Sequence, residues 1–287
     1  MNERKPMVSL YQVVRTMSVE YKRWIFSTKM LLLVFLVVYT KQQLVEPLLE
    51  LTDRVDGTLQ ILEPSIAFMG SSSMFFILPV LYLLVMGNYP RKDADTAFVF
   101  VRIGRKGWFL GQVLFSLAAA FTVLCFMLIF TTLWCVGRLQ WHHGIWSNAV
   151  TRYYQETGND FKFNLITGNI YNQMHPVPAF IHSFVLVFLL LVLLSQIQMF
   201  CSMVDRPLLG IGVSGVIATI GNGLAVLNLR PMMWFFPIAH TQIRLRHELL
   251  FDGESMPLYL SYLYFMISIV VLTLISWIML KRKKRLL

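Results

Sequence analysis

A continuous apolar run at 258–280 is followed directly by five cationic residues at 281–285, and this pairing constrains the fold more than any other feature. A helix needs about 20 apolar residues to cross a hydrocarbon core of about 30 Å. Cationic segments beside a span resist translocation and stay on the cytoplasmic side. The pairing therefore predicts a final membrane span whose basic tail, 281–287, lies in the cytoplasm.

The rest of the chain contains further apolar runs of bilayer length. Hydrophobic residues make up 56% of the 287 residues and charged residues only 14%, with a mean hydropathy of +0.62. Soluble proteins carry roughly 25% charged residues. We therefore predict an all-α polytopic membrane protein with six transmembrane helices in a single transmembrane domain, 1–287. The predicted spans are about 24–41, 66–88, 108–136, 177–204, 208–228 and 258–280.

The distribution of charge predicts how the chain is threaded. An even number of spans places both termini on one side, which the basic tail identifies as cytoplasmic. In this threading 17 of the 25 Lys and Arg residues face the cytoplasm, and 10 of the 15 acidic residues face the other side. The formal charge of +10 is thus explained by cationic cytoplasmic segments, which set the topology and attract anionic lipids. The charge does not point to nucleic-acid binding. We expect a multi-pass protein of the cytoplasmic (inner) membrane of a bacterium.

The segment before the first span, 1–23, has an amphipathic pattern. Leu10, Val13, Met17 and Tyr21 recur at helical spacing. This pattern predicts a cytoplasmic amphipathic helix on the membrane surface, which either anchors the first span or also contacts a cytoplasmic partner. The other faces of this helix carry Arg15, Glu20, Lys22 and Arg23.

The connection 89–107 is longer than a turn between two spans requires. Pro90 ends the second span, and Asp93 or Asp95 could cap a short helix whose apolar side includes Phe98. Two interpretations remain. The loop is basic because cytoplasmic loops generally are, or the helix docks a soluble partner. The charged residues of the loop are Arg91, Lys92, Asp93, Asp95, Arg102, Arg105 and Lys106.

Three segments are predicted on the opposite side of the membrane. The acidic stretch 42–64 favours a helical extension of the first span above the bilayer. The loop 138–176 is rich in Trp, Tyr, His and Asn and is broken by turn-forming residues, so it predicts a compact interfacial cap. The stretch 230–237 is apolar, contains two prolines and is too short to cross. It predicts a re-entrant or interfacial element.

Three patterns imitate catalytic or cofactor motifs. The run 210–215 matches GxGxxG, but it opens an apolar span and follows no strand. Within it, Ser214 matches the GxSG motif of rhomboid proteases, whose serine needs an imidazole as its base, and the last span contains no His. His247 and Glu248 begin an HExxH motif, but Phe251 stands at the second ligand position. We therefore predict no catalytic residue and no metal site, and we disfavour a rhomboid-like protease.

The energy source for any transport is also constrained. No acidic or basic residue lies at the middle of a predicted span, where an ion-driven carrier usually keeps its coupling site. No GxxxxGK[ST] motif is present to cradle nucleotide phosphates. Uphill transport would therefore need energy from another polypeptide.

The layout resembles that of the membrane subunit of type 2 ABC exporters. The resemblance covers most of the chain: an amphipathic inner helix, six spans, the inner loop and a proline-containing outer element before the last span. It is carried locally by RIGRKGW at 102–108, which enters span three, and by the stretch 231–237 after span five. The outer loop 138–176 is longer than expected for that family.

The resemblance implies two membrane subunits, as a homodimer or a related heterodimer, above cytoplasmic ATPase subunits that bind ATP and Mg. This chain would bind no cofactor itself. The loop 90–106 would supply the coupling helix and 9–23 the connecting helix, so that closure of the ATPases moves the spans. The implied coupling residues are Arg91, Lys92, Asp93, Asp95, Phe98, Arg102, Arg105 and Lys106, and those of the connecting helix are Arg15, Glu20, Lys22 and Arg23. The pathway would be lined by Ser71, Ser72, Ser73 and Asn222.

The function expected from this resemblance is that of a non-enzymatic permease subunit. It would form the translocation pathway and export an amphipathic, peptide or lipid-like substrate, using ATP hydrolysed by a separate subunit. One alternative stays open: a self-contained six-span membrane enzyme or immunity protein that acts on lipids or peptides from its outer loops.

Overall fold

The computed structural model describes residues 9–87, 89–92, 94–141, 144–156, 166–246 and 256–282. The predicted coupling residue Asp93 lies outside the described residues, as do 1–8 of the amphipathic segment and 283–287 of the basic tail. Almost all described elements are helices. The two short strands form one parallel pair, with Leu59 opposite Leu139 and Gln60 opposite Gln140.

The elements follow one another along the chain in this order: α1 (Leu10–Ile25), η1 (Thr28–Met30), α2 (Leu31–Thr40), η2 (Lys41–Val45), α3 (Glu46–Arg54), β1 (Leu59–Gln60), α4 (Glu63–Gly70), α5 (Ser72–Val85), α6 (Ala94–Leu133), η3 (Val136–Arg138), β2 (Leu139–Gln140), α7 (Asn148–Glu156), α8 (Gly168–Gln173), α9 (Pro176–Met203), α10 (Pro207–Val226), η5 (Met232–Phe235), α11 (Pro237–Thr241), η6 (Ile243–Leu245) and α12 (Leu258–Arg282).

Within the described residues, five helical segments are long and apolar enough to cross a membrane, or six if the bent pair α4–α5 counts as one span. Because these segments dominate the described chain and the sheet is a single short pair, the predicted all-α polytopic membrane fold is confirmed. The five segments are Thr28–Arg54, Phe98–Leu133, Pro176–Met203, Pro207–Val226 and Leu258–Arg282.

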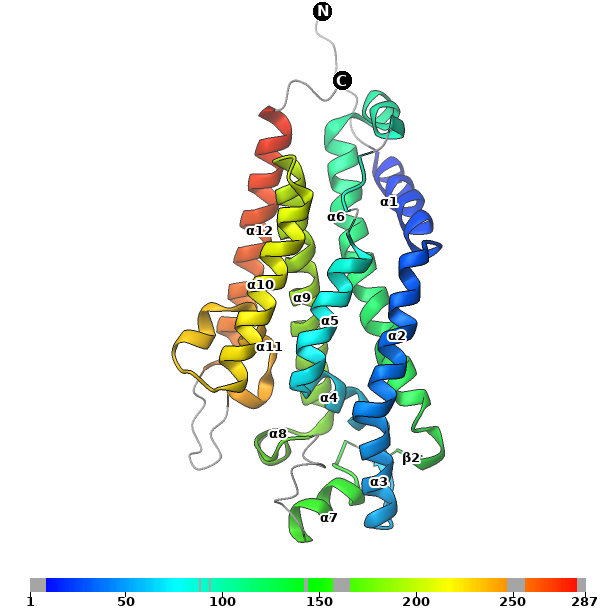
Figure 1. The fold of residues 1–287 in the computed structure, drawn as a ribbon, viewed down its shortest axis with the longest axis vertical. Helices are drawn as coiled ribbons and strands as arrows, with labels where there is room; N and C mark the ends of the chain where they lie inside the picture. The colour runs from blue at the N-terminus through cyan, green and yellow to red at the C-terminus, as the bar shows by residue number, and fades with distance from the viewer. Residues whose placement is uncertain are drawn as a thin grey trace, which may run out of the picture.

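The helices form an elongated bundle (Figure 1). The helices α2, α5, α6, α9, α10 and α12 run along its long axis. The start of α1, the connection from α5 to α6 and the C-terminal end of α12 lie together at one end, which we call the upper end. The helices α3, α7 and α8 lie at the opposite, lower end. The described chain therefore begins and finishes at the upper end.

The second predicted span, 66–88, is not one continuous helix. The chain forms α4 and α5 instead, bent by 78° at a break where Ser71 is extended (φ −75°, ψ 126°). The 14 residues of α5 rise only about 21 Å, less than the hydrocarbon thickness of about 30 Å. The break arises because Gly70 is a weak helix former and Ser71 favours the position before a first helical turn.

The helix α6 begins at Ala94, well before the predicted start of the third span at 108, so most of the loop 89–107 is helical. The helix is interrupted at Gly104, whose φ of 74° and ψ of 165° suit only glycine. The segment 94–103 therefore turns away from the rest of α6, and Figure 1 shows it end on at the upper end. Asp95 falls in the first turn of this segment.

Several polar residues within the spans join neighbouring helices. The Gln196 amide on α9 donates to Ser116 Oγ on α6 at 3.0 Å, and it accepts from Thr273 Oγ1 on α12 at 3.2 Å. Tyr82 on α5 and Ser195 on α9 share a hydrogen bond of 2.6 Å. Such bonds stabilise contacts between membrane helices. Burial of apolar surface contributes little there, because lipid tails are as apolar as the side chains they would replace. These bonds give the polar side chains involved a structural role.

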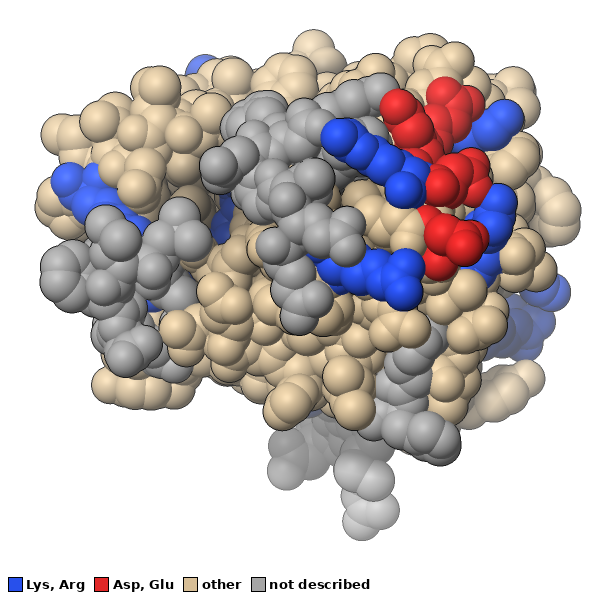
Figure 2. Space-filling view, turned by 90° about the horizontal axis from the view of Figure 1, so that it is seen from below, with Lys and Arg blue, Asp and Glu red and all other residues tan. Residues whose placement is uncertain are grey.

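The lower end forms a compact cap in which the side chain of Glu63, in the first turn of α4, is buried. Glu63 is 0% exposed and accepts hydrogen bonds from the backbone N–H of Gln60 at 2.9 Å and of Ser147 at 2.7 Å. Figure 2, seen from below, shows exposed acidic side chains gathered on one side of this end and flanked by Lys and Arg. At the lower end, Arg138 of η3 pairs with Asp53 of α3.

Candidate functional site

The predicted connecting and coupling segments lie side by side at the upper end. The helix α1 packs lengthwise against α6: Tyr21 Oη and Thr122 Oγ1 are 2.8 Å apart, and the rings of Trp24 and Phe115 meet edge to face at 5.8 Å. A Cβ added to Gly111 would come within 3.0 Å of Thr16, so glycine permits this close approach. The apolar stripe of α1, which we expected to rest on lipid, therefore packs partly on protein.

The segment 94–103 presents apolar side chains outward. Phe98 is 75% exposed and Val101 is 78% exposed. Phe100 packs edge to face on buried Trp108 at 5.1 Å, which holds the segment against the main part of α6. Of the predicted coupling cations near it, Arg102 and Lys106 are exposed and Arg105 is half-buried. The segment is therefore held to the rest of α6 by Phe100, and its face with Phe98 and Val101 is exposed.

A groove with a volume of about 360 Å³ runs between α1 and the segment 94–103. Its charged lining consists of Arg15, Glu20, Arg23, Arg91 and Arg102. Residues predicted for the connecting helix and for the coupling loop thus line the same groove, with four cations and one acid.

Four of the predicted cations do not line this groove: Lys22, Lys92, Arg105 and Lys106. Lys22 is exposed and is absent from the lining of the groove. Lys92 donates to the Ser202 carbonyl and pairs with Asp205 at 3.4 Å. Lys92 therefore ties the segment after α5 to the turn between α9 and α10.

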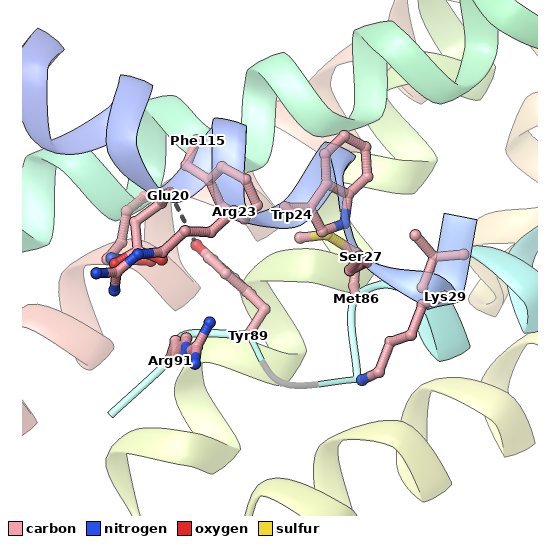
Figure 3. Close-up of a pocket in the computed structure, with 11 residues that line it drawn as sticks. Glu20, Arg23, Trp24, Ser27, Lys29, Met86, Tyr89, Arg91 and Phe115 are labelled. Atoms are coloured by element: carbon pink, nitrogen blue, oxygen red, sulfur yellow. Dashed lines mark hydrogen bonds between the residues drawn. The ribbon is translucent and has the colours of Figure 1, made fainter. Parts of the chain in front are cut away.

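A smaller cavity of about 90 Å³ lies between α1, the segment after α5 and α6 (Figure 3). Glu20, Arg23 and Arg91 line both this cavity and the groove. The Tyr89 hydroxyl donates to the Gln112 carbonyl at 3.0 Å, and burial raises the pKa of Tyr89, so the hydroxyl stays protonated. The sequence did not predict this cavity, because its walls come from three separated segments that only the packing of α1 on α6 brings together.

The predicted pathway serines lie at the break between α4 and α5. Ser71 and Ser73 share a hydrogen bond of 2.9 Å, and Arg244 donates to Ser72 Oγ and to Gln242 Oε1. Sequence reasoning missed Arg244. The only local signal was its position after the proline-containing stretch 230–237, for which the sequence predicts a re-entrant or interfacial element. A cation therefore faces the first turn of α5, where the helix dipole adds positive potential.

Asn222 is buried in α10, which packs against α5. A Cβ placed on Gly87, just after α5, would lie 3.7 Å from Ile211, near the start of α10. The two helices are antiparallel, so Ser72 and Asn222 both lie on the same side of this contact. Asn222 therefore lies about one helical turn from the level of Ser72. Among the described residues, no hydrogen bond joins Asn222 to the three serines, so they share a region and not a contact.

No group of three or more His, Cys, Asp or Glu residues in the described part of the chain could hold a metal ion. Comparison with protein-family models, with curated proteins and with solved structures finds no match to this chain. The resemblance to ABC exporters therefore rests on the layout of the sequence alone.

Proposed function

We propose that this chain is the membrane subunit of an ABC exporter of the type 2 layout. In this proposal it crosses the inner membrane of a bacterium six times, with α4 and α5 together forming the second crossing and both termini in the cytoplasm. A second copy or a related chain completes the pathway. Separate ATPase subunits bind ATP and Mg beneath the upper end.

The single observation that carries the proposal is the exposed segment 94–103 beside the cationic groove. Large apolar side chains exposed next to charged ones are typical of a surface that binds a protein. The anchor of Phe100 on Trp108 gives this segment a stiff link to α6. A partner bound here would act directly on a helix that crosses the membrane.

The orientation is supported by charge. The cations of α1, of the α5–α6 connection and of the C-terminal end of α12 are all at the upper end, whereas the acidic face of α3 is at the lower end. Cationic segments that flank spans stay in the cytoplasm. The upper end is therefore the cytoplasmic side in this proposal, where ATP is available.

Coupling would work through rigid contacts and one break. Closure of two ATPases moves the segment 94–103, and the Phe100–Trp108 contact passes this movement to α6 and to the attached α1. The spans shift as packed bodies between discrete arrangements. The break before Ser72 lets α5 change its angle to α4, which is buried in the bundle. The serines, Arg244 and Asn222 then line the route of an amphipathic, peptide or lipid-like substrate.

Co-purification from the native host tests the proposal. A tagged chain extracted in mild detergent is expected to retain an ATPase that carries a GxxxxGK[ST] motif, identified by mass spectrometry. The retained complex should hydrolyse ATP, and mutation of the motif lysine should abolish that hydrolysis. Recovery of a folded chain that never retains such an ATPase, under conditions that preserve other membrane complexes, would contradict the proposal.

A further inference from the structure

The small cavity of Figure 3 has an excess of positive charge. Its charged lining consists of Arg23, Lys29 and Arg91 against the single carboxylate of Glu20. The cations come from α1, from η1 and from the segment after α5, and Figure 3 shows these segments on different sides of the same space. A lining with net positive charge favours a bound anion.

The same cavity contains buried polar atoms that have no partner among the described residues. They are Trp24 Nε1, Ser27 Oγ and Gln112 Nε2. Trp24 is only 9% exposed and Gln112 only 1%. An indole nitrogen and an amide nitrogen can only donate hydrogen bonds, and a hydroxyl can donate one. The unsatisfied groups are therefore donors, and buried donors without acceptors are uncommon in native structures.

We infer that this cavity binds a phosphate group at the upper end of the bundle. A phosphate has several acceptor oxygens and negative charge, which match three unpaired donors and an excess of cations. The group can belong to an anionic phospholipid headgroup or to a soluble phosphate compound, since both present the same oxygens. This inference does not depend on an ATPase partner, because every group involved belongs to this chain.

The variant Gln112→Leu separates binding from folding. The Gln112 amide nitrogen makes no hydrogen bond in the described structure, so its loss removes no internal bond and is expected to leave the melting temperature of the empty protein unchanged or raised. Binding of phosphate is expected to weaken about tenfold, as for one charge-assisted hydrogen bond. Lys29→Gln should weaken binding by a similar factor.

Arg206→Gln is the matched control, because Arg206 is an exposed cation beside α10 that lines neither this cavity nor the groove.

The experiment uses the purified full chain in phosphatidylcholine nanodiscs. Thermal shift is measured with inorganic phosphate against chloride of equal ionic strength, and native mass spectrometry counts retained phosphatidylglycerol when the nanodiscs include it. Retention of this lipid that falls in Gln112→Leu and Lys29→Gln but not in Arg206→Gln supports the site, with a lipid as the source of the phosphate. Stabilisation by inorganic phosphate with the same dependence, and no retained lipid, supports it with a soluble source. Equal behaviour of all four proteins, or no binding at all, overturns it and leaves a cavity that holds water only.

Discussion

Replacing Glu63 with leucine is expected to lower the free energy of unfolding by about 3 kcal/mol. The fully buried carboxylate accepts two backbone N–H groups, from Gln60 at 2.9 Å and from Ser147 at 2.7 Å. Leucine leaves both donors buried without an acceptor, and each such donor costs about 1–3 kcal/mol. Because Gln60 belongs to β1 and Ser147 precedes α7, the loss should separate the lower-end cap from α4.

The measurement is unfolding of the purified chain in detergent. Glu63→Gln retains one carbonyl acceptor and should lose about half as much stability as the leucine variant. Asp53→Asn is the control: it removes a carboxylate at the same end, but Asp53 is 60% exposed in its ion pair with Arg138. Exposed pairs contribute about 0–1 kcal/mol. Equal stability of the Glu63→Leu variant and the wild type would show that the cap does not depend on this carboxylate.

Reversing two charges, Arg102→Glu with Arg105→Glu, is expected to reduce ATPase retention at least tenfold. Arg102 lines the groove beside α1, and Arg105 follows the break at Gly104. Like charges placed across a protein interface cost several kcal/mol, and 1.4 kcal/mol already corresponds to tenfold in affinity. Arg206→Glu removes an exposed cation at the same end outside the groove and should retain the ATPase.

Charge reversal in a loop can also change membrane topology, so each variant needs a topology check. The accessibility of a cysteine placed at Phe98 to a membrane-impermeant reagent should be the same in all variants. Full retention of the ATPase by a correctly inserted Arg102/Arg105 double variant would exclude the groove as the docking surface.

The sequence predicted the helical membrane fold because a bilayer imposes a length and a polarity that are visible as apolar runs. It predicted the boundaries of 177–204, 208–228 and 258–280 within a few residues of α9, α10 and α12. The sequence did not predict the bend in the second span, because hydropathy does not register a bend between two apolar helices. The GSSS stretch at 70–73 was the available signal, since a glycine followed by serines favours a helix start over a helix interior.

The arrangement of the candidate site could be predicted from the sequence only in part. Periodicity and charge identified α1 and the segment 94–103 separately, and the resemblance to a known layout suggested that they are neighbours. Their shared groove depends on Gly111, which lets α1 approach α6, and on the turn at Gly104. The small cavity also needs Lys29 and Gln112, which are distant in sequence and carry no motif. Contacts of this kind depend on tertiary packing, and no local pattern encodes them.

Cross-linking from Phe98 tests the central claim most directly. A photoreactive amino acid replaces Phe98 in one variant and Leu133 in the control, where Leu133 is also exposed but lies at the far end of α6. We predict that illumination in native membranes joins the Phe98 variant to an ATPase that carries a GxxxxGK[ST] motif, and that the Leu133 variant forms no such product. Absence of an ATPase adduct at Phe98, in a chain that is inserted and abundant, would contradict the assignment of this protein as the membrane subunit of an ABC exporter.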